Sequence, residues 1–327
     1  MTRILMALAC LLAACAPLAD RRAARIEARN PPQGQFLEVA GTRIHAEVRG
    51  HGPDVVLLHG ASGSARDMDD LARRLQDRYR VISFDRPGLG YSGDLGTAGL
   101  SPLVQADYLR AAAAQLGVRE PIVLGHSYGG AVAMAWALIE PKTRGVVVVS
   151  GAVLPWEGGY DGVYGLAASP LAEATLQPLA AAFMPDWLLD HIIGTLFAPQ
   201  PLPPDYAADT GAELALRPGP MRTNLRQLTH LKAYLWRMGP HYRELTLPIE
   251  IVQGSADRTI APRVHAIPMT ALPNVHLTLL PGVGHMAHHA APEAVIAAID
   301  RVARRGRVSP PATAQGASAA AHPRPGP

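Results

Sequence analysis

The chain has 327 residues, and 48% of them are hydrophobic, so it can bury the core of one large domain or of two small ones. Its formal net charge at pH 7 is only +3, and its clustered arginines are not interleaved with aromatic residues, as they are on nucleic-acid-binding faces. These features argue against nucleic acid as a partner.

The N-terminal segment predicts export. Arg3 precedes an apolar run over residues 4–14, which is shorter than the roughly 20 residues of a membrane-spanning helix but fits the apolar part of a secretory signal peptide. The Leu-Ala-Ala-Cys segment Leu12–Cys15 resembles the lipobox of bacterial lipoproteins, in which the cysteine is lipidated and becomes the first residue of the mature protein. By this resemblance residues 1–15 are a signal peptide. Residues 16–33 are rich in Arg, Ala and Pro, which predicts a tether to the membrane.

The residue after the lipobox cysteine is Ala16, where an aspartate would indicate retention at the inner membrane. The resemblance therefore implies a lipid anchor on Cys15 in the outer membrane, with the protein facing the periplasm or the exterior. An ordinary signal peptide cleaved after Ala16 is the alternative, and it would release a soluble periplasmic or secreted protein. Both cysteines, Cys10 and Cys15, lie in this segment, so a mature lipoprotein would have neither a disulfide nor a cysteine nucleophile.

Alternating apolar and helical segments predict an α/β fold. Phe36–Val39 and Arg43–Val48 have the alternation of an antiparallel hairpin. Downstream, continuous apolar strands alternate with helical stretches, which is typical of a mostly parallel sheet covered by helices on both faces. The six further strands predicted are Asp54–Leu58, Arg80–Phe84, Pro121–Gly125, Arg144–Val149, Leu247–Gly254 and Val275–Leu280.

A serine lies at the apex of a predicted strand–turn–helix. The turn is Gly125-His-Ser127-Tyr-Gly129, which follows an apolar strand and precedes a run of small residues. A G-x-S-x-G turn forces its serine into a strained backbone conformation, and the flanking glycines let the strand and the helix approach each other. The Ser127 hydroxyl then lies at the positive end of a helix, where developing negative charge is favoured.

A serine nucleophile needs a base and a group that orients the base. Asp257 lies in the loop after the seventh predicted strand, and His285 lies in the loop after the eighth. Asp257 could equally cap the N-terminus of a helix. His288 and His289 compete with His285 for the role of base, but they lie toward the next helix, and we expect them to be solvated or to support the site. This histidine cluster has no matched set of carboxylates or cysteines nearby, so no metal site is predicted.

The chain order Ser127, Asp257, His285 resembles that of the α/β-hydrolase superfamily. The resemblance covers about residues 35–305. It implies an α/β-hydrolase fold, which is a mostly parallel eight-stranded sheet flanked by helices, with a helical cap inserted after the sixth strand. The core then comprises residues 34–151 and 246–305, and the cap comprises residues 152–245. Residues 306–327 are expected to be a disordered tail.

The same resemblance implies the remaining parts of the site. Two backbone amides are expected to form the oxyanion hole. One is that of Tyr128, which follows the nucleophile, and the other is that of Ala61, which lies in the His-Gly loop after the third strand. His59 is expected to support that loop. Asp85, which begins the Asp-Arg-Pro-Gly-Leu-Gly-Tyr-Ser segment after the fourth strand, is expected to be a structural carboxylate.

The predicted cap is rich in aromatic residues, among them Trp156, Trp187 and Trp236. Some of these side chains form the core of the cap, and others are expected to line an apolar substrate pocket over Ser127. The sequence therefore predicts a serine hydrolase, most similar to carboxylesterases, that cleaves small-to-medium apolar esters by an acyl-enzyme mechanism without a cofactor.

Several alternatives use the same residues. Serine at the apex argues against epoxide hydrolase and haloalkane dehalogenase activity, because the members of this superfamily with those activities need an aspartate there. Hydrolysis of carbon–carbon, lactone or thioester bonds and cofactor-free haloperoxidase chemistry remain possible on the Ser127 triad. A lipoprotein that binds an apolar ligand with an idle triad is the non-catalytic alternative.

Overall fold

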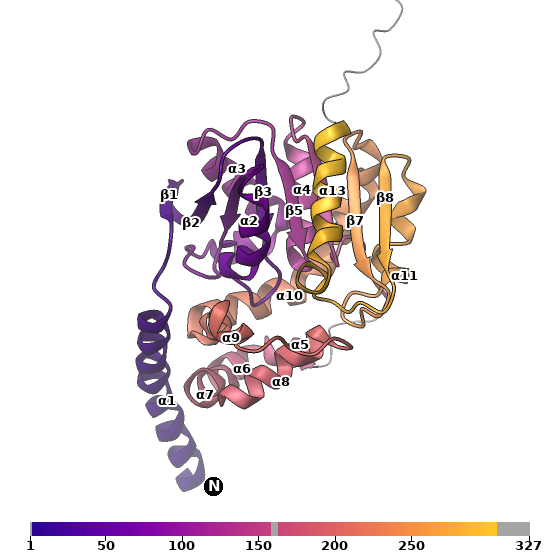
Figure 1. The fold of residues 1–327 in the computed structure, drawn as a ribbon. Helices are drawn as coiled ribbons and strands as arrows, with labels where there is room; N and C mark the ends of the chain where they lie inside the picture. Colours follow the sequence, from indigo (N-terminus) through magenta and orange to yellow (C-terminus); the bar gives the residue numbers. More distant parts are fainter. Residues whose placement is uncertain (1, 158–162, 306–327) are drawn as a thin grey trace, which may run out of the picture.

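The computed structural model describes residues 2–157 and 163–305, and its centre is a single sheet (Figure 1). Within the described residues this sheet has eight strands, in the order β1-β2-β4-β3-β5-β6-β7-β8. β2 is antiparallel to both of its neighbours, and all other pairs are parallel, as predicted. The strands are β1 (Gln35–Val39), β2 (Thr42–Arg49), β3 (Asp54–Leu58), β4 (Arg80–Phe84), β5 (Ile122–His126), β6 (Gly145–Val149), β7 (Ile249–Gly254) and β8 (Val275–Leu280).

Helices cover both faces of the sheet because the central strands are apolar on both sides. Val56 and Leu58 of β3 belong to the hydrophobic cluster that includes residues of α3 and α4. Their neighbours Val55 and Leu57 belong to a second cluster, which includes residues of α2 and α13. The four covering helices are α2 (Asp69–Leu75), α3 (Pro102–Gln115), α4 (Tyr128–Ile139) and α13 (Pro292–Arg305).

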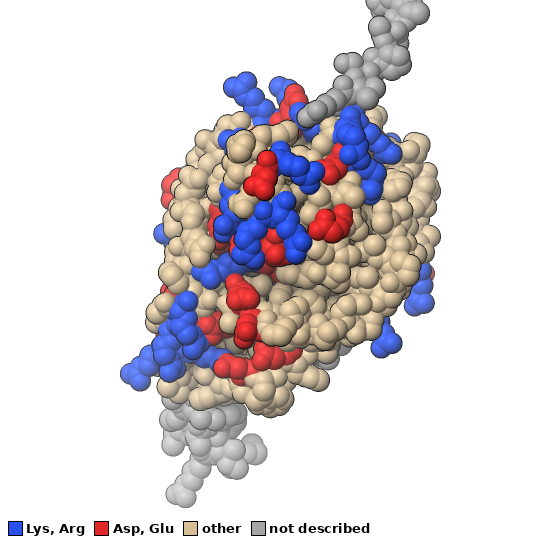
Figure 2. All heavy atoms as spheres, in the orientation of Figure 1, with Lys and Arg blue, Asp and Glu red and all other residues tan. Residues whose placement is uncertain are grey.

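Short helices occur in the loops of the core. They are η1 (Ala65–Met68), η2 (Gly96–Leu100), α11 (Pro262–His265), η5 (Pro268–Ala271) and α12 (Ala287–Ala290). On the face shown in Figure 2, acidic side chains lie among the basic ones. Ion pairs such as Arg74–Glu293 at 3.3 Å and Arg78–Asp300 at 2.9 Å connect α2 and the turn after it to α13.

The segment between β6 and β7 forms the predicted helical cap. Its longest helix, α10, packs on the core through Leu231, Leu235 and Met238. Asn224 of α10 also bonds to Ser62 in the loop directly after β3, so α10 lies over the carboxyl end of the sheet. The cap helices are α5 (Val163–Ala167), α6 (Pro170–Ala174), α7 (Leu176–Phe183), α8 (Asp186–Phe197), α9 (Tyr206–Asp209), η3 (Ala212–Leu216), α10 (Pro218–Met238) and η4 (Gly239–Glu244).

The N-terminal segment is one helix, α1 (Thr2–Arg29), which continues through most of the predicted tether. It contacts α7, and its side chains Cys15, Ala19 and Ile26 are buried. Its last residue, Arg29, donates to Glu213 of the cap at 3.1 Å. A search of the described helices finds none with the length and apolar content that a membrane span requires. The predicted tail, residues 306–327, lies outside the described residues.

Candidate active site

Ser127 has the backbone conformation that the turn predicts. It lies between β5 and α4 with φ 52° and ψ −119°. A Cβ on Gly125 would lie 2.0 Å from the carbonyl oxygen of Gly129, and a Cβ on Gly129 would lie 2.3 Å from that of Leu58. Because both contacts are with backbone atoms, only glycine fits at these two positions, and the serine is held above the carboxyl end of the sheet.

Asp257 and His285, which are 28 residues apart in sequence, meet at the ends of β7 and β8. The Nδ1 atom of His285 lies 2.9 Å from Oδ2 of Asp257, and both side chains are buried. The loops that carry them are joined by a hydrogen bond from the amide of Ala256 to the carbonyl of Val283 at 2.9 Å. With Nδ1–H donating to the carboxylate, Nε2 of the imidazole is left free to accept a proton.

Three further donors fix the Asp257 carboxylate. Its Oδ1 accepts from the amides of Thr259 and Ile260, each at 2.8 Å, so it also caps the turn toward α11. Its Oδ2 accepts from Nε2 of Gln253 at 2.9 Å. The carboxylate thus bonds both to His285 and to the turn before α11, whose own N-cap is Ala261. Gln253 was missed by the sequence analysis, although a polar residue inside the apolar strand β7 was a signal for it.

The imidazole of His285 lies close to the nucleophile turn. Its ring centroid is 4.9 Å from that of His126, the neighbour of Ser127, and Nε2 of His126 lies 3.3 Å from the carbonyl oxygen of His285. Burial lowers the pKa of His126 well below 6.5, so this ring is uncharged. Among the described residues the Ser127 hydroxyl makes no hydrogen bond. Catalytic hydrogen bonds of this kind often tighten only when substrate is bound.

The loop after β3 lies directly against the serine. A Cβ on Gly60 would be 3.1 Å from Cβ of Ser127. Among the described residues, the amides of Ala61 and Tyr128 donate no hydrogen bond of the kind made in turns and loops. Tyr128 is the first residue of α4, so its amide has no acceptor within that helix either. Tyr128 directly follows Ser127, and Ala61 directly follows the glycine that lies against it.

A buried arginine that the sequence analysis did not single out holds this loop. Arg86 donates to the carbonyls of His59 and Gly60, each at 3.0 Å. Its guanidinium lies 4.3 Å from the ring centroid of Tyr128 and also donates to Gln227 of α10 at 2.9 Å. Burial lowers the pKa of Arg86 to about 10, which leaves it charged at neutral pH. Arg86 thus connects the oxyanion loop, the nucleophile turn and the cap.

His59 supports the loop, as predicted. Its Nδ1 lies 2.8 Å from the carbonyl oxygen of Gly60, and its Nε2 accepts from the amide of Arg86 at 2.9 Å. Burial, reinforced by the charge of Arg86, lowers the pKa of His59 to about 4. The ring is therefore neutral, with its proton on Nδ1.

Asp85 is a structural carboxylate, as predicted. It accepts from the amides of Ala65 at 2.6 Å and Tyr91 at 2.7 Å, and its Oδ2 lies 2.7 Å from Nδ1 of His45. Burial alone would raise the pKa of Asp85, but the hydrogen bond and charge of His45 outweigh burial and lower it.

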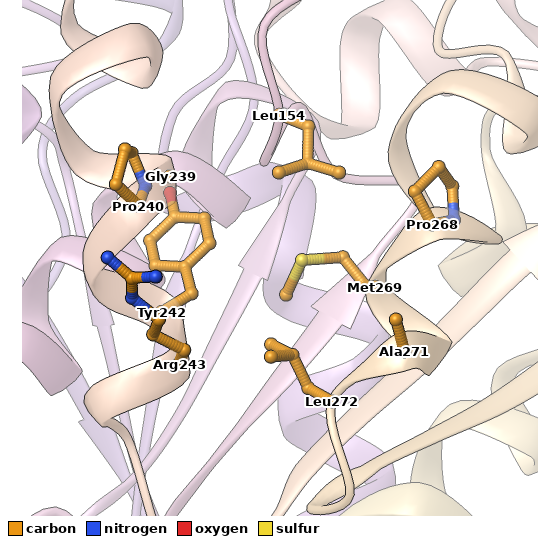
Figure 3. Close-up of a pocket in the computed structure, with 9 residues that line it drawn as sticks. All are labelled: Leu154, Gly239, Pro240, Tyr242, Arg243, Pro268, Met269, Ala271 and Leu272. Atoms are coloured by element: carbon orange, nitrogen blue, oxygen red, sulfur yellow. The ribbon is translucent and has the colours of Figure 1, made fainter.

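The cap tryptophans differ in their surroundings. Trp187 and Trp236 are 69% and 63% exposed, so neither belongs to a cap core, whereas the ring of Trp156 lies 5.9 Å from that of His265. A cavity of about 270 Å³ lies between η4 and η5, and Figure 3 shows Tyr242 facing Met269 across it. None of its nine lining residues belongs to the predicted triad, so this cavity is separate from the candidate active site.

The two histidines after His285 are not solvated. His288 is 1% exposed, and His289 is partly buried. Both lie beside Asp67, a carboxylate of η1 that the sequence analysis did not connect with them. The matched carboxylate that appeared to be missing therefore comes from a segment more than 200 residues away.

Comparison with known proteins shows the family of this chain. The model of the alpha/beta hydrolase family matches residues 55–298. The chain is 30% identical over 252 residues to the magnesium-chelatase 30 kDa subunit of Rhodobacter capsulatus. This alignment covers 73% of this chain and 83% of that protein. It is 25% identical over 259 residues to a 2-hydroxy-6-oxononadienedioate/2-hydroxy-6-oxononatrienedioate hydrolase of Comamonas testosteroni, covering 75% of this chain and 85% of that protein.

Among solved structures, an esterase from Exiguobacterium antarcticum has the same fold. The two structures superimpose with a TM-score of 0.68 at 19% sequence identity. The match covers 83% of this chain and 100% of the esterase. The sheet order, the glycine-flanked turn at Ser127 and the family match over residues 55–298 lead to one conclusion. The chain belongs to the alpha/beta hydrolase family.

Proposed function

We propose that this protein is a serine hydrolase that cleaves carboxylic esters, with Ser127, His285 and Asp257 as its catalytic triad. The observation that supports this most is the hydrogen bond of 2.9 Å between His285 and Asp257, both buried, beside a serine in the strained conformation of a nucleophile turn. The amides of Ala61 and Tyr128 serve as the oxyanion donors.

The reaction proceeds in two halves. In the first, Nε2 of His285 takes the proton of the Ser127 hydroxyl, and the serine oxygen attacks the ester carbonyl. The two amides stabilise the oxyanion, and the imidazolium then protonates the leaving alcohol. In the second half, His285 takes a proton from water, the hydroxide attacks the acyl-enzyme, and the acid is released while Ser127 regains its proton. Throughout, Asp257 orients the ring and stabilises its charged form.

A substitution at the nucleophile tests this proposal. Ser127→Ala should reduce the kcat/KM for p-nitrophenyl butyrate by at least about 1000-fold and leave the melting temperature unchanged. Thr270→Ala, which removes an exposed hydroxyl on η5, should retain full activity. Ester hydrolysis by Ser127→Ala at the wild-type rate would refute the assignment.

A second candidate is hydrolysis of a carbon–carbon bond in a 2-hydroxy-6-oxo dienoate. What favours it is the similarity to the Comamonas testosteroni hydrolase, at 25% identity over 259 residues. The same triad would serve, with a carbanion in place of the alcohol as leaving group. Ratios of kcat/KM for short p-nitrophenyl esters and for 2-hydroxy-6-oxo-6-phenylhexa-2,4-dienoate separate the two candidates, because the preferred class should exceed the other by about 100-fold or more.

We also propose that the protein is exported and lipid-anchored through Cys15. Support comes from the lipobox segment Leu12–Cys15. At the other end of α1, Glu27 and Arg29 pair with the cap residues Arg217 and Glu213 at 2.7 Å and 3.1 Å. Cleavage before Cys15 would leave these contacts in place. Incorporation of labelled palmitate in a bacterial host should be lost in Cys15→Ala and kept in Cys10→Ala. Equal labelling of both variants, or of neither, would contradict the lipid anchor.

A further inference from the structure

Three potential metal ligands converge behind the candidate active site. Asp67 belongs to η1, and His288 and His289 belong to α12, two segments that are 222 residues apart. Oδ1 of Asp67 lies 3.0 Å from Nε2 of His289, and Oδ2 lies 3.4 Å from Nε2 of His288. One ligand atom from each residue can be chosen so that all three lie within 4.8 Å of one another.

The His288 ring lacks the partners that a buried imidazole needs. It is only 1% exposed, and neither of its ring nitrogens has a hydrogen-bond partner among the described residues. A buried polar atom without a partner loses its hydrogen bonds to water and gains none in return, so such atoms are rare and call for an explanation. Nε2 of His288 has only its 3.4 Å approach to Oδ2 of Asp67, and a metal ion between these two groups would give it a bond.

The spacing of the three groups fits zinc. Ligands of a tetrahedral zinc ion, each about 2.0–2.1 Å from the metal, are separated from one another by about 3.3 Å. Nε2 of His289 lies 3.0 Å from Oδ1 of Asp67, and Nε2 of His288 lies 3.4 Å from Oδ2, so each imidazole is near this separation from one of the two carboxylate oxygens. Two imidazoles and one carboxylate are a donor set that suits zinc, whereas magnesium and calcium prefer oxygen ligands alone.

We propose that Asp67, His288 and His289 bind a zinc ion, with water as the fourth ligand. The chemical class of the ligand is a divalent transition metal, and the site is separate from the triad. It shares a segment with the triad, because His285 precedes His288 by three residues.

Groups around the cluster would support such a site. The hydroxyl of Tyr206, in α9 of the cap, donates to Oδ1 of Asp67 at 2.6 Å, and such hydrogen bonds orient carboxylates that bind a metal. The ring of His289 is 5.2 Å from that of Tyr206. On the other side, the ring of His288 is 4.2 Å from that of His126, which contacts the carbonyl of His285. Bound zinc would therefore connect η1 to the segment that carries the catalytic base.

Metal titration of the untagged full chain, first depleted with a chelator, tests the site. Isothermal calorimetry should show one equivalent of Zn²⁺ bound to the wild type, and Mg²⁺ as the probe should show none. Zinc should raise the melting temperature, because a ligand that binds only the folded state stabilises it. Asp67→Asn and His288→Gln should each bind zinc at least tenfold more weakly and should lose most of the thermal shift.

Matched variants control for nonspecific binding. Asp70→Asn, in the next turn of the same segment, and His230→Gln, an exposed histidine of α10, should bind zinc like the wild type. If Asp67→Asn fails to fold, His289→Gln replaces it, and the Co²⁺ spectrum of the wild type should show the intense visible bands of tetrahedral coordination. Two results would overturn the proposal. One is binding of less than about 0.2 equivalents of zinc per wild-type chain, and the other is wild-type affinity for zinc in both Asp67→Asn and His288→Gln.

Discussion

Asn224 of the cap forms two hydrogen bonds with Ser62 of the oxyanion loop. Its Oδ1 accepts from the Ser62 amide at 2.8 Å, and its Nδ2 donates to the Ser62 hydroxyl at 2.8 Å. Ser62 has a φ of 56° and directly follows Ala61, the proposed oxyanion donor. The position of that donor therefore depends on a cap residue 162 positions later in the chain.

Replacing this amide should affect turnover more than stability. Asn224→Ala removes both bonds and frees the loop, so the Ala61 amide is no longer held toward the oxyanion. Loss of one oxyanion donor costs about 100-fold in kcat, so a displaced donor should cost about tenfold, with KM nearly unchanged. Steady-state kinetics with a p-nitrophenyl ester measure this. Arg237→Ala, an exposed change on the same helix, is the control, and an equal kcat in both variants would contradict the role.

Arg86 should be the opposite case, because its loss affects the fold. Arg86→Met leaves the carbonyls of His59 and Gly60 and the side chain of Gln227 without their buried donor. Breaking a buried charged network of this kind costs about 3–5 kcal/mol. Urea denaturation followed by circular dichroism should show that loss. Arg226→Met, which breaks an exposed ion pair to Glu173, should cost less than about 1 kcal/mol.

The glycine after the nucleophile should tolerate no side chain. In Gly129→Ala the new methyl group would lie 2.3 Å from the carbonyl oxygen of Leu58, so α4 must move away from β3. We expect a loss of about 3 kcal/mol or more in the free energy of unfolding, together with loss of esterase activity. Gly194→Ala in α8, where a Cβ meets nothing within 4 Å, is the matched control. It should be neutral or stabilising by up to about 1 kcal/mol.

The pair of His45 and Asp85 should make stability depend on pH. Burial opposes the charged form of His45, but the hydrogen bond and charge of Asp85 outweigh it and raise the pKa above 6.5. A raised pKa in the folded state stabilises the protein below pH 6.5, and this contribution is lost as the pH rises through the folded-state pKa. His45→Gln should therefore lose more stability relative to the wild type at about pH 6 than at about pH 8. Chemical denaturation at both pH values measures the difference. The same loss at both values would contradict the raised pKa.

Local sequence patterns predicted the sheet and singled out the three residues of the proposed triad, because each pattern depends on neighbours in the chain. The turn at Ser127 needs glycines two positions away on either side, and Asp257 and His285 each follow an apolar strand. The supporting contacts could not be predicted in this way. Asn224 meets Ser62 across 162 residues and His289 meets Asp67 across 222, and no local pattern pairs groups so distant in sequence.

The N-terminal helix shows the same limit in another form. The composition of residues 16–33, rich in Arg, Ala and Pro, predicts a tether. The structure has helix through Arg29, because Ala and Arg are strong helix formers and Ile26 finds a buried place against Leu214 and Leu216. The partners of this helix lie in the cap, about 200 residues later, so composition alone could not reveal them.

The central claim is that Ser127 is a nucleophile activated by His285 and oriented through Asp257. Reaction with a fluorophosphonate probe, followed by peptide mass spectrometry, tests it most directly. The account predicts rapid labelling of the wild type at Ser127, slowed by at least about 1000-fold in His285→Ala. Rapid labelling that persists in folded His285→Ala, or no labelling of folded wild type, would contradict it.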